Sequence, residues 1–415
     1  MCDIIEMENT MKIKRILLIT ALICLTNRYS NFTFTQNDNN SNENVQETVE
    51  VFNQNETIDL GIQAKASFLM DYDTGSILYA KNETQRLPIA SMCKIMTLTL
   101  CFEAIDNGLL AMNDEICVSE RAASMGGSQV FLEANAKYPV YELIKSIIVC
   151  SANDSCVALA ERISGSESIF IDAMNKKATE LGADNTLFAN CTGLPKEPQY
   201  SCAKDVAIML KSLLSHEEYY KFGKVWLDKF QHPEGRYTEI TNTNKLIRSY
   251  DGCDGGKTGF TNEAGFCLAA TAKRNNMRII SVVIGEENSK NRFDDVTTMF
   301  DYAFANYENK LIFQAESALN ENVSVKGGRE QFCSVYPQKD VYVFCRRGEK
   351  ADIVTEIHEI KNSAPISKGD IVGELLVFKN GIEINRIPLQ ASMSIEKANI
   401  FDWLKRISQD WNARK

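Results

Sequence analysis

Residues 88–97, PIASMCKIMT, place a serine and a lysine three positions apart, at Ser91 and Lys94. A serine hydroxyl is a weak nucleophile that needs a base, and a lysine serves as one when its pKa falls towards neutrality. The apolar pattern after the proline predicts a helix starting near Ser91, which puts Lys94 one turn on, on the same face. Taken alone, the pair favours a plain helix start with a solvated lysine, so the rest of the chain must decide.

Two further stretches supply polar groups of complementary kinds. Ser151 and Asn153 lie in VCSANDSCVALAE, ahead of a helical apolar pattern. Lys257, Thr258 and Gly259 lie in DGGKTGFTNEAGFCLAA, where the pattern becomes strand-like. The ordered set S-x-x-K, S-x-N and K-T-G is a far stronger indication of acyl-transfer chemistry than any one of its members.

Acyl-transfer chemistry assigns a role to each polar residue of the first two motifs. Ser91 is the expected nucleophile, Lys94 its base, and Ser151 a relay that carries a proton to the leaving amine. Burial and a second cation, Lys257, both disfavour the charged form of Lys94. Asn153 suits a hydrogen bond to a substrate amide.

The K-T-G stretch is expected to bind the end of the substrate. Lys257 and Thr258 offer a cation and a hydroxyl to a terminal carboxylate, and Gly259 lets an extended peptide approach the strand backbone closely. The backbone N–H groups of Ser91 and Phe260 then form an oxyanion hole, in which each donor lowers the barrier by roughly 3 kcal/mol.

These motifs lie within longer stretches that resemble the low-molecular-mass penicillin-binding proteins, which act as serine-type D-Ala-D-Ala carboxypeptidases. The likeness covers about residues 60–310 and is carried by MDYDTGSILYAKNETQRLPIASMCKIMT, VYELIKSIIVCSANDSCVALAE, NCTGLPKEPQYSCAKDVAIML and GGKTGFTNEAGFCLAATA. It implies removal of the terminal D-alanine from peptidoglycan stem peptides, with β-lactams as inhibitors. One departure is Pro195, which follows Gly-Leu where some members carry an aspartate.

Two other functions share the motifs. A β-lactamase-like hydrolase needs a fast route for water to the acyl-enzyme, and class A enzymes use a glutamate for it; no E-x-x-L-N stretch occurs between 153 and 257. A protein that binds β-lactams or cell wall without turnover would become acylated at its serine, and the acyl-enzyme would not be hydrolysed. Both remain alternatives to the carboxypeptidase.

Composition excludes several other classes. The chain of 415 residues is 44% hydrophobic, with a net charge of −10, which argues against nucleic acid as a partner. With three histidines and no Cys/His cluster of zinc spacing, neither a metal nor a cofactor is expected. The thirteen cysteines are interpreted mainly as buried free thiols, although disulfides stay open.

Changes in residue composition and hydrophobic periodicity along the chain predict its division into domains. A positive, then apolar start predicts a signal peptide at 1–27, with translation starting at Met1 or Met11, and an Asn-rich disordered linker at 28–58. The catalytic domain is expected at 59–310, as an α+β, transpeptidase/β-lactamase-like fold whose helices pack on an antiparallel sheet. Its elements are a hairpin around Asp73-Thr74-Gly75, helices in 91–106, 140–164, 168–181, 203–214 and 290–308, and strands in 237–286 with a turn at Asn275-Asn276.

Short β runs broken by glycine predict a small all-β domain at 311–393. The tail, 394–415, predicts an amphipathic helix with one apolar face and five basic against three acidic residues; that face carries Ile400, Trp403, Leu404, Ile407 and Trp411. Such a helix suits a membrane surface, and packing on its own domain is the alternative. Export and a wall substrate together imply the outer face of a bacterial cytoplasmic membrane.

Overall fold

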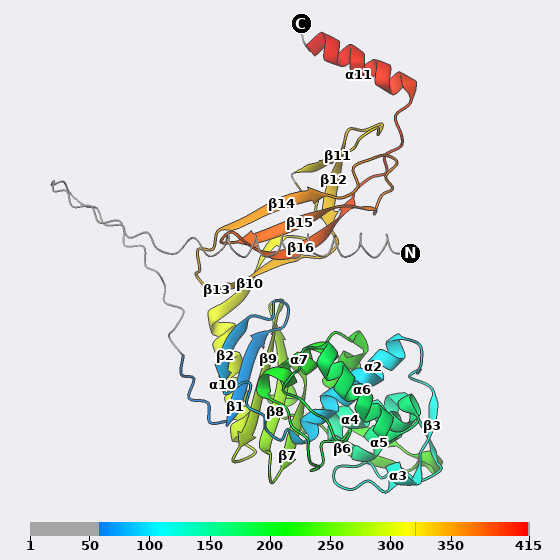
Figure 1. The fold of residues 1–415 in the computed structure, drawn as a ribbon, viewed down its shortest axis with the longest axis vertical. Helices are drawn as coiled ribbons and strands as arrows, with labels where there is room; N and C mark the ends of the chain where they lie inside the picture. Colours follow the sequence, from blue (N-terminus) through cyan, green and yellow to red (C-terminus); the bar gives the residue numbers. More distant parts are fainter. Residues whose placement is uncertain (1–57, 320, 414–415) are drawn as a thin grey trace, which may run out of the picture. The chain divides into compact units, whose positions relative to one another are not determined.

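The computed structural model describes residues 58–319 and 321–413 (Figure 1). The predicted signal peptide and nearly all of the predicted linker lie outside this part of the chain.

The catalytic domain is built on one antiparallel sheet with strand order β2-β1-β9-β8-β7. Its strands are β1 (Ala66–Asp71), β2 (Ile77–Lys81), β7 (Cys253–Thr261), β8 (Gly265–Arg274) and β9 (Met277–Glu286). Every residue of β1 and β9 is buried, because both faces of these central strands are covered by helices. Strand β7 forms one edge of this sheet, and its outer side is therefore available for other contacts.

Two tight turns were predicted correctly and fix the register of this sheet. In the β1–β2 turn, Asp71 accepts hydrogen bonds from the backbone and hydroxyl of Thr74. In the β8–β9 turn, Asn275 and Asn276 both have positive φ, 47° and 61°, which asparagine tolerates better than most residues. The strands on either side therefore pair in one register from Arg274 opposite Met277 to Leu268 opposite Val283, and the register shifts only before Phe266.

Helices cover both faces of the sheet (Figure 1). Helix α10 (Asn291–Asn306) packs on one face, with a core that includes Leu69, Leu268 and Phe300. The helices that belong to the core on the opposite face are α2 (Lys94–Asp106), α4 (Val140–Cys150), α5 (Asn153–Ser164), α6 (Glu167–Glu180) and α7 (Ala203–Leu213). The predicted layer arrangement of helices on an antiparallel sheet is confirmed.

Smaller elements complete the domain. They are the 3-10 turns Ala90–Cys93, Glu217–Tyr219 and Pro233–Gly235, the short helices α3 (Glu120–Ala123), α8 (Tyr220–Gly223) and α9 (Leu246–Ser249), and the strands β3 (Glu115–Cys117), β4 (Lys137–Pro139), β5 (Leu227–Gln231) and β6 (Tyr237–Thr241).

Two predicted elements are corrected by the structure. The helical pattern of 140–164 is interrupted at Ser151, which has a φ of 66° and caps α4 before α5 begins. The region 237–286, predicted as strands with a turn at Asn275-Asn276, also contains the helical turn α9, which carries the chain from β6 to β7. In both places a local change of backbone direction outweighs a continuous apolar pattern.

The cysteines behave mostly as apolar side chains. All eleven described cysteines are free, and all except Cys117 and Cys150 are buried. Cys93, between Ser91 and Lys94, is fully buried, and its thiol donates to the Asn190 carbonyl. The interpretation as buried thiols holds for this part of the chain.

The second domain is all-β, as predicted. Its strands are β10 (Tyr307–Phe313), β11 (Asn322–Ser324), β12 (Phe332–Pro337), β13 (Val341–Arg346), β14 (Ile353–Glu359), β15 (Ile371–Lys379) and β16 (Ile382–Ala391). β10 pairs with β13, and the other five form one sheet in the order β11-β12-β16-β15-β14. A compact core of valine and leucine side chains, among them Val335, Val343 and Leu389, holds it together.

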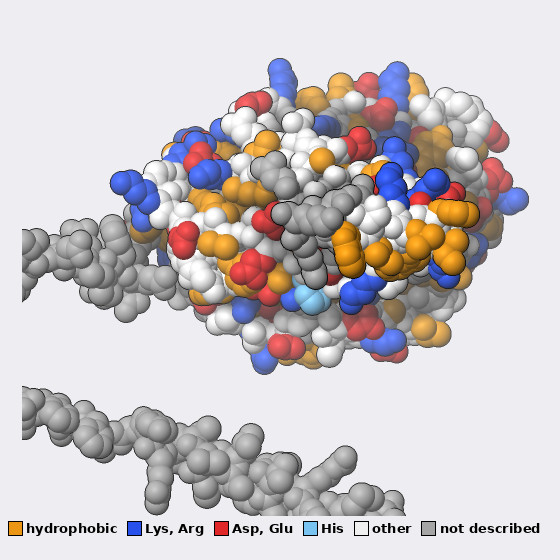
Figure 2. All heavy atoms as spheres, turned by 90° about the horizontal axis from the view of Figure 1, so that it is seen from above, with side chains coloured by type: hydrophobic (Ala, Val, Ile, Leu, Met, Phe, Trp, Pro, Cys, Tyr) orange, Lys and Arg blue, Asp and Glu red, His pale blue; other side chains and the backbone are white. Residues whose placement is uncertain are grey.

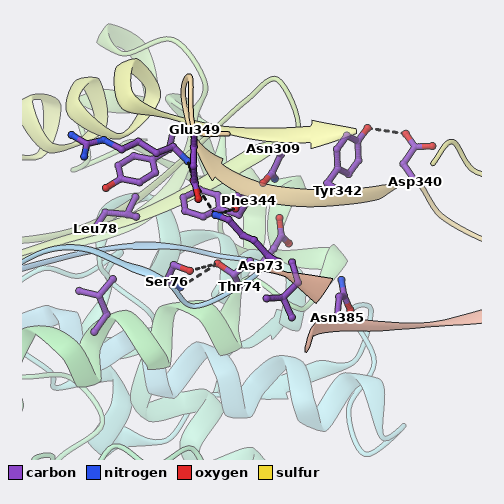
Figure 3. A pocket seen from close by; sticks show the side chains of 15 residues that line it. Asp73, Thr74, Ser76, Leu78, Asn309, Asp340, Tyr342, Phe344, Glu349 and Asn385 are labelled. Carbon is purple, nitrogen blue, oxygen red and sulfur yellow. Dashed lines mark hydrogen bonds and ion pairs between the residues drawn. The ribbon is translucent and has the colours of Figure 1, made fainter. Parts of the chain in front are cut away.

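A hollow of about 690 Å³ lies where the β1–β2 turn faces strands β10 and β13 (Figure 3). Its polar groups mostly bond each other: Tyr342 donates to Asp340, and Lys379 pairs with Glu349. None of the residues that line it belongs to the predicted site.

The last element of the described structure is helix α11 (Ile400–Ala413). Its apolar side chains are exposed, from 48% at Trp403 to 76% at Phe401. Figure 2, which looks from the end of Figure 1 where α11 lies, shows apolar side chains gathered next to basic ones. Within the described residues, none of the helices has the length and apolar character needed to cross a membrane.

Candidate active site

Ser91 and Lys94 meet at the start of α2. Ser91 lies in the 3-10 turn Ala90–Cys93, and α2 begins at Lys94, so the two side chains project from the same face. The Lys94 amine lies 3.0 Å from the Ser91 hydroxyl and donates to the Thr192 carbonyl at 2.6 Å. Lys94 is fully buried, and burial lowers the pKa of its amine. A neutral amine beside the hydroxyl is what a general base requires.

The loop 190–194 supports Lys94, and sequence analysis had given it no role. The Asn190 side chain accepts the backbone N–H groups of Thr192 and Gly193, which aims the Thr192 carbonyl at the lysine. Gly193 has a φ of 80°, and a Cβ there would lie 2.0 Å from the Ala90 carbonyl oxygen. Only glycine therefore lets this loop pack against the residue before Ser91.

Ser151 and Asn153 lie at the junction of α4 and α5. Asn153 is anchored by its side-chain donation to the Gly126 carbonyl and by its backbone donation to Ser128, both at 2.7 Å. The hydroxyl of Ser151 and the side-chain oxygen of Asn153 are buried without a hydrogen-bond partner among the described residues. Buried polar atoms normally have partners, so these two are free for a ligand. The proton relay predicted for Ser151 has no direct hydrogen bond to Lys94 here.

Strand β7 passes directly beside Ser91. A Cβ on Gly259 would lie 3.2 Å from the Ser91 backbone nitrogen, so the glycine permits this approach. Lys257 is 2% exposed, and burial together with repulsion from Lys94 lowers its pKa to about 7. Thr258 is buried, and its hydroxyl donates to Thr243 at 2.7 Å. Phe260 is half exposed, and its ring stacks on Phe266.

A third cation, Arg292, lies behind this strand and was missed. It projects from the first turn of α10, is 9% exposed, and donates to the Gly259 carbonyl at 3.3 Å. Its Nε atom is buried without a partner in the described structure, and burial lowers its pKa. Arg292 also contributes to the lowered pKa of Lys257. The sequence shows only an arginine near a helix start, with no motif to mark it.

The site therefore combines the Ser91–Lys94 pair with the unpartnered oxygens of Ser151 and Asn153. It also includes the edge of β7, next to which the cationic side chains of Lys257 and Arg292 are buried. All eight predicted residues come from the three stretches that sequence analysis singled out, and the structure brings the serine–lysine pair and the K-T-G strand into contact. Such a site can hold an anion and activate a hydroxyl side by side.

Two family models match the chain. The model for D-alanyl-D-alanine carboxypeptidase (Peptidase S11) matches residues 51–288, and the model for the C-terminal domain of penicillin-binding protein 5 matches residues 307–397. The chain belongs to the D-alanyl-D-alanine carboxypeptidase family. The two matches lie on the two structured domains described above.

Relatives support the same assignment. The D-alanyl-D-alanine carboxypeptidase DacF of Bacillus subtilis is 43% identical over 361 residues, which are 86% of this chain and 92% of that protein. Penicillin-binding protein 5 of Haemophilus influenzae is structurally similar, with a TM-score of 0.64, 31% identity and coverage of 81% and 98% of the two chains. Penicillin-binding protein D2 of Listeria monocytogenes, solved in an ampicillin-bound form, has a TM-score of 0.54 and 29% identity, and covers 60% of this chain and 100% of its own.

These findings confirm the predicted family, the fold class and the enzyme class, a serine-type D-Ala-D-Ala carboxypeptidase. The roles of the individual site residues, the domain boundaries and the membrane contact of the tail remain predictions.

Proposed function

We propose that Ser91 attacks the carbonyl between the last two D-alanines of a peptidoglycan stem peptide. A bond forms between the Ser91 hydroxyl oxygen and that carbonyl carbon, and the hydroxyl proton passes to Lys94. The carbon–nitrogen bond then breaks, and the proton reaches the leaving amine of D-alanine through Ser151. The backbone N–H groups of Ser91 and Phe260 stabilise the oxyanion.

Hydrolysis of the ester completes the cycle. Lys94 takes a proton from water, the hydroxide attacks the acyl carbon, and the carbon–oxygen bond to Ser91 breaks as the proton returns to the serine. During both steps Lys257 and Thr258 bind the terminal carboxylate or its departing product, and Asn153 holds the upstream amide. Gly259 lets the peptide lie along β7.

The observation that carries this proposal is the buried amine of Lys94, 3.0 Å from the Ser91 hydroxyl. The test incubates the purified chain with a peptide ending in D-Ala-D-Ala and assays free D-alanine. We expect steady release by the wild type and none by Ser91→Ala, with benzylpenicillin labelling Ser91 in the wild type alone. Labelling elsewhere in the chain would contradict the assignment of the nucleophile.

Two alternatives are distinguished by the same assay. Fast hydrolysis of benzylpenicillin without D-alanine release would favour a β-lactamase-like hydrolase. Stable labelling with turnover of neither compound would favour a protein that binds β-lactams or wall without catalysis. The lack of an E-x-x-L-N stretch between 153 and 257 favours the carboxypeptidase over the first alternative.

We further propose that the chain is exported and that α11 lies on the outer surface of the cytoplasmic membrane. The exposed side chains of Ile400, Trp403, Ile407 and Trp411 support this, because an apolar stripe of this size is costly in water. Two polar contacts tie the helix to the β domain: Arg406 donates to the carbonyls of Gly328 and Arg329, and Asp402 forms an ion pair with Arg329. Its apolar side chains are thereby left free to meet lipid.

The membrane contact is tested with residues 28–415 and vesicles that contain anionic lipid. We expect the chain to sediment with the vesicles, and a matched chain ending at 398 to stay in solution with unchanged D-alanine release. Equal sedimentation of the two chains would contradict the proposal and favour a helix that serves its own domain.

A further inference from the structure

Ten residues of the described structure, other than glycines, have a positive φ, and eight of these ten are exposed. The exposed ones are Asn82, Phe131, Asn135, Glu234, Asn275, Asn276, Glu316 and Asn380. The two buried ones are Ala90, which directly precedes Ser91, and Ser151, and each is 4% exposed. A left-handed backbone at a residue with a Cβ is strained, and such strain collects at functional sites.

Alanine is poorly suited to this conformation. Ala90 has a φ of 48°, and its methyl group cannot hydrogen-bond to the backbone. Five of the eight exposed residues are asparagines, whose side chain makes the left-handed region less costly. Glycine would adopt it without strain. An alanine here keeps a strain that one substitution would remove, which indicates that its methyl group is needed.

The peptide bond between Ala90 and Ser91 is approached closely by two glycines. A Cβ on Gly193 would lie 2.9 Å from the Ser91 nitrogen. A Cβ on Gly259 would lie 3.2 Å from the same nitrogen and 2.7 Å from the Ile89 carbonyl oxygen. The loop 190–194 and strand β7 can therefore pack against this peptide bond only because neither has a side chain at the point of contact.

Both glycines are fixed by contacts of their own. The backbone N–H of Gly193 donates to the Asn190 side chain at 2.6 Å. Gly259 pairs with Cys267 in the sheet, and its carbonyl accepts from Arg292 at 3.3 Å. Two distant parts of the chain thus hold the strained turn in place, which is the condition under which such strain persists.

The methyl group of Ala90 points towards β7. Its Cβ lies 3.2 Å from the position that a Cβ on Gly259 would take, so it fills space that the glycine leaves. It also confines residue 90 to the narrow left-handed region, whereas a glycine would reach several regions equally well. Because the peptide bond is planar, the backbone angles of residue 90 set the direction of the Ser91 N–H.

We propose that Ala90 is a positioning residue for the oxyanion hole, and that its strained backbone and its methyl group together aim the N–H of Ser91 at the oxyanion. This inference rests on the proposed function, in which the N–H groups of Ser91 and Phe260 stabilise that oxyanion. The interaction forms only in the transition state, so a misdirected N–H lowers kcat and leaves KM unchanged.

The test compares the wild type with Ala90→Gly and Ala90→Ser, each as the whole chain. Glycine removes the strain and the methyl group, whereas serine keeps a Cβ. The matched control is Glu234→Gly, at an exposed position of the same domain with a φ of 61°. The measurements are kcat and KM for D-alanine release, the melting temperature, and the affinity for a peptide boronic acid, whose tetrahedral adduct with a serine mimics the transition state.

Ala90→Gly is expected to lower kcat about a hundredfold with KM within about twofold of wild type, and to weaken boronic acid binding by a similar factor. Its melting temperature should be at or above that of the wild type, because relief of strain offsets the lost methyl contact. Ala90→Ser should keep kcat within about threefold. Glu234→Gly should change neither the kinetics nor the affinity for the boronic acid.

A wild-type kcat in Ala90→Gly would overturn the inference. A rise in KM at unchanged kcat would do the same, because Ala90 would then serve substrate binding. So would a fall of several degrees in melting temperature together with kcat, because Ala90 would then support the fold. Failure of the wild type to release D-alanine would instead overturn the proposed function.

Discussion

Polar side chains are buried at the candidate active site, whereas apolar side chains are exposed along helix α11. Lys94 and Lys257 are at most 2% exposed, while Phe401 and Trp411 are exposed by 70% or more. Neither arrangement helps the chain to fold, because burying an amine and leaving a large apolar side chain in water are both costly. Each cost is offset by the ligand proposed for it above: an anionic peptide at the active site, and a membrane surface at the tail.

The difference also concerns rigidity. The cleft is fixed by contacts between distant segments, such as Lys94 with Thr192 and Thr258 with Thr243. Helix α11 touches its domain mainly through Arg406 and the ion pair of Asp402 with Arg329. Chemistry needs groups held in position before the substrate arrives, whereas attachment to a surface needs only an apolar face.

The contrast between a buried active site that serves catalysis and an exposed helix that serves attachment would fail most clearly if Lys94 were needed for folding. We expect Lys94→Met to lower kcat/KM for D-alanine release by at least about a thousandfold, which corresponds to roughly 4 kcal/mol of barrier. Its melting temperature should stay within about 3 °C of wild type, since methionine fills a similar volume. The exposed Lys176→Met is the control and should alter neither quantity. A large loss of stability in Lys94→Met would mean that the amine has a structural role.

A second prediction concerns pH and the other buried lysine. Burial lowers the pKa of Lys257 to about 7 in the folded chain, from the ordinary lysine value of 10.5. Between these two pH values the unfolded chain therefore binds a proton that the folded chain lacks. Stability should therefore rise with pH from about 7 to 10.5 through this group, and Lys257→Met should lose that rise. KM should increase above pH 7 in the wild type, because only the charged amine attracts a carboxylate. A melting temperature with the same pH slope in both proteins would contradict this account.

The carboxyl group of Glu286 is buried outside the active site, and it shows how a buried ionisable group without a catalytic role affects stability. Glu286, at the end of β9, is 2% exposed, and burial together with nearby Asp295 raises its pKa to about 8. Between pH 4.5 and 8 the unfolded chain has lost a proton that the folded chain keeps, so this group makes stability fall as pH rises.

Glu286→Gln should therefore melt several degrees higher than wild type at pH 8, with no difference at pH 4, and should keep its D-alanine release. Thermal unfolding at the two pH values measures the effect. Equal melting temperatures at pH 8 would mean that the carboxyl is already ionised or partnered.

The smallest effect is expected in α11. Ile407→Ser and Trp411→Ser should change the melting temperature by about 1 °C or less, because both side chains are already exposed to water, by 61% and 70%. The control, Leu389→Ser in the buried core of the β domain, should lower it by far more. A marked loss of stability in the two α11 variants would show that this face packs on protein.

The contact of Ser91 with Lys94 and the place of the K-T-G strand beside them were predictable, because acyl transfer limits which residue types can serve and the motifs recur in a fixed order. The supporting groups were not. Thr192 and Gly255 act through backbone carbonyls, which every residue has, so their residue types carry no signal. Arg292 and Thr243 act only because the fold brings them to β7.

The same reasoning applies to the fold. Alternating apolar positions predicted the sheet and most helices, since burial of one face dictates that pattern. The break at Ser151 left no trace in the pattern, because serine is not a residue that marks a left-handed turn as glycine or asparagine does. Yet that turn is what separates α4 from α5 and leaves the Ser151 hydroxyl without a partner.

The contacts along the edge strand β7 have a consequence for solubility as well. An unpaired strand edge is a template on which another chain can add a strand, and it invites self-association. Here Tyr219 and segment 242–244 contact β7 at Gly256, Gly255 and Thr258, so these positions are covered. These positions of β7 are therefore not free to pair with a strand of a neighbouring molecule.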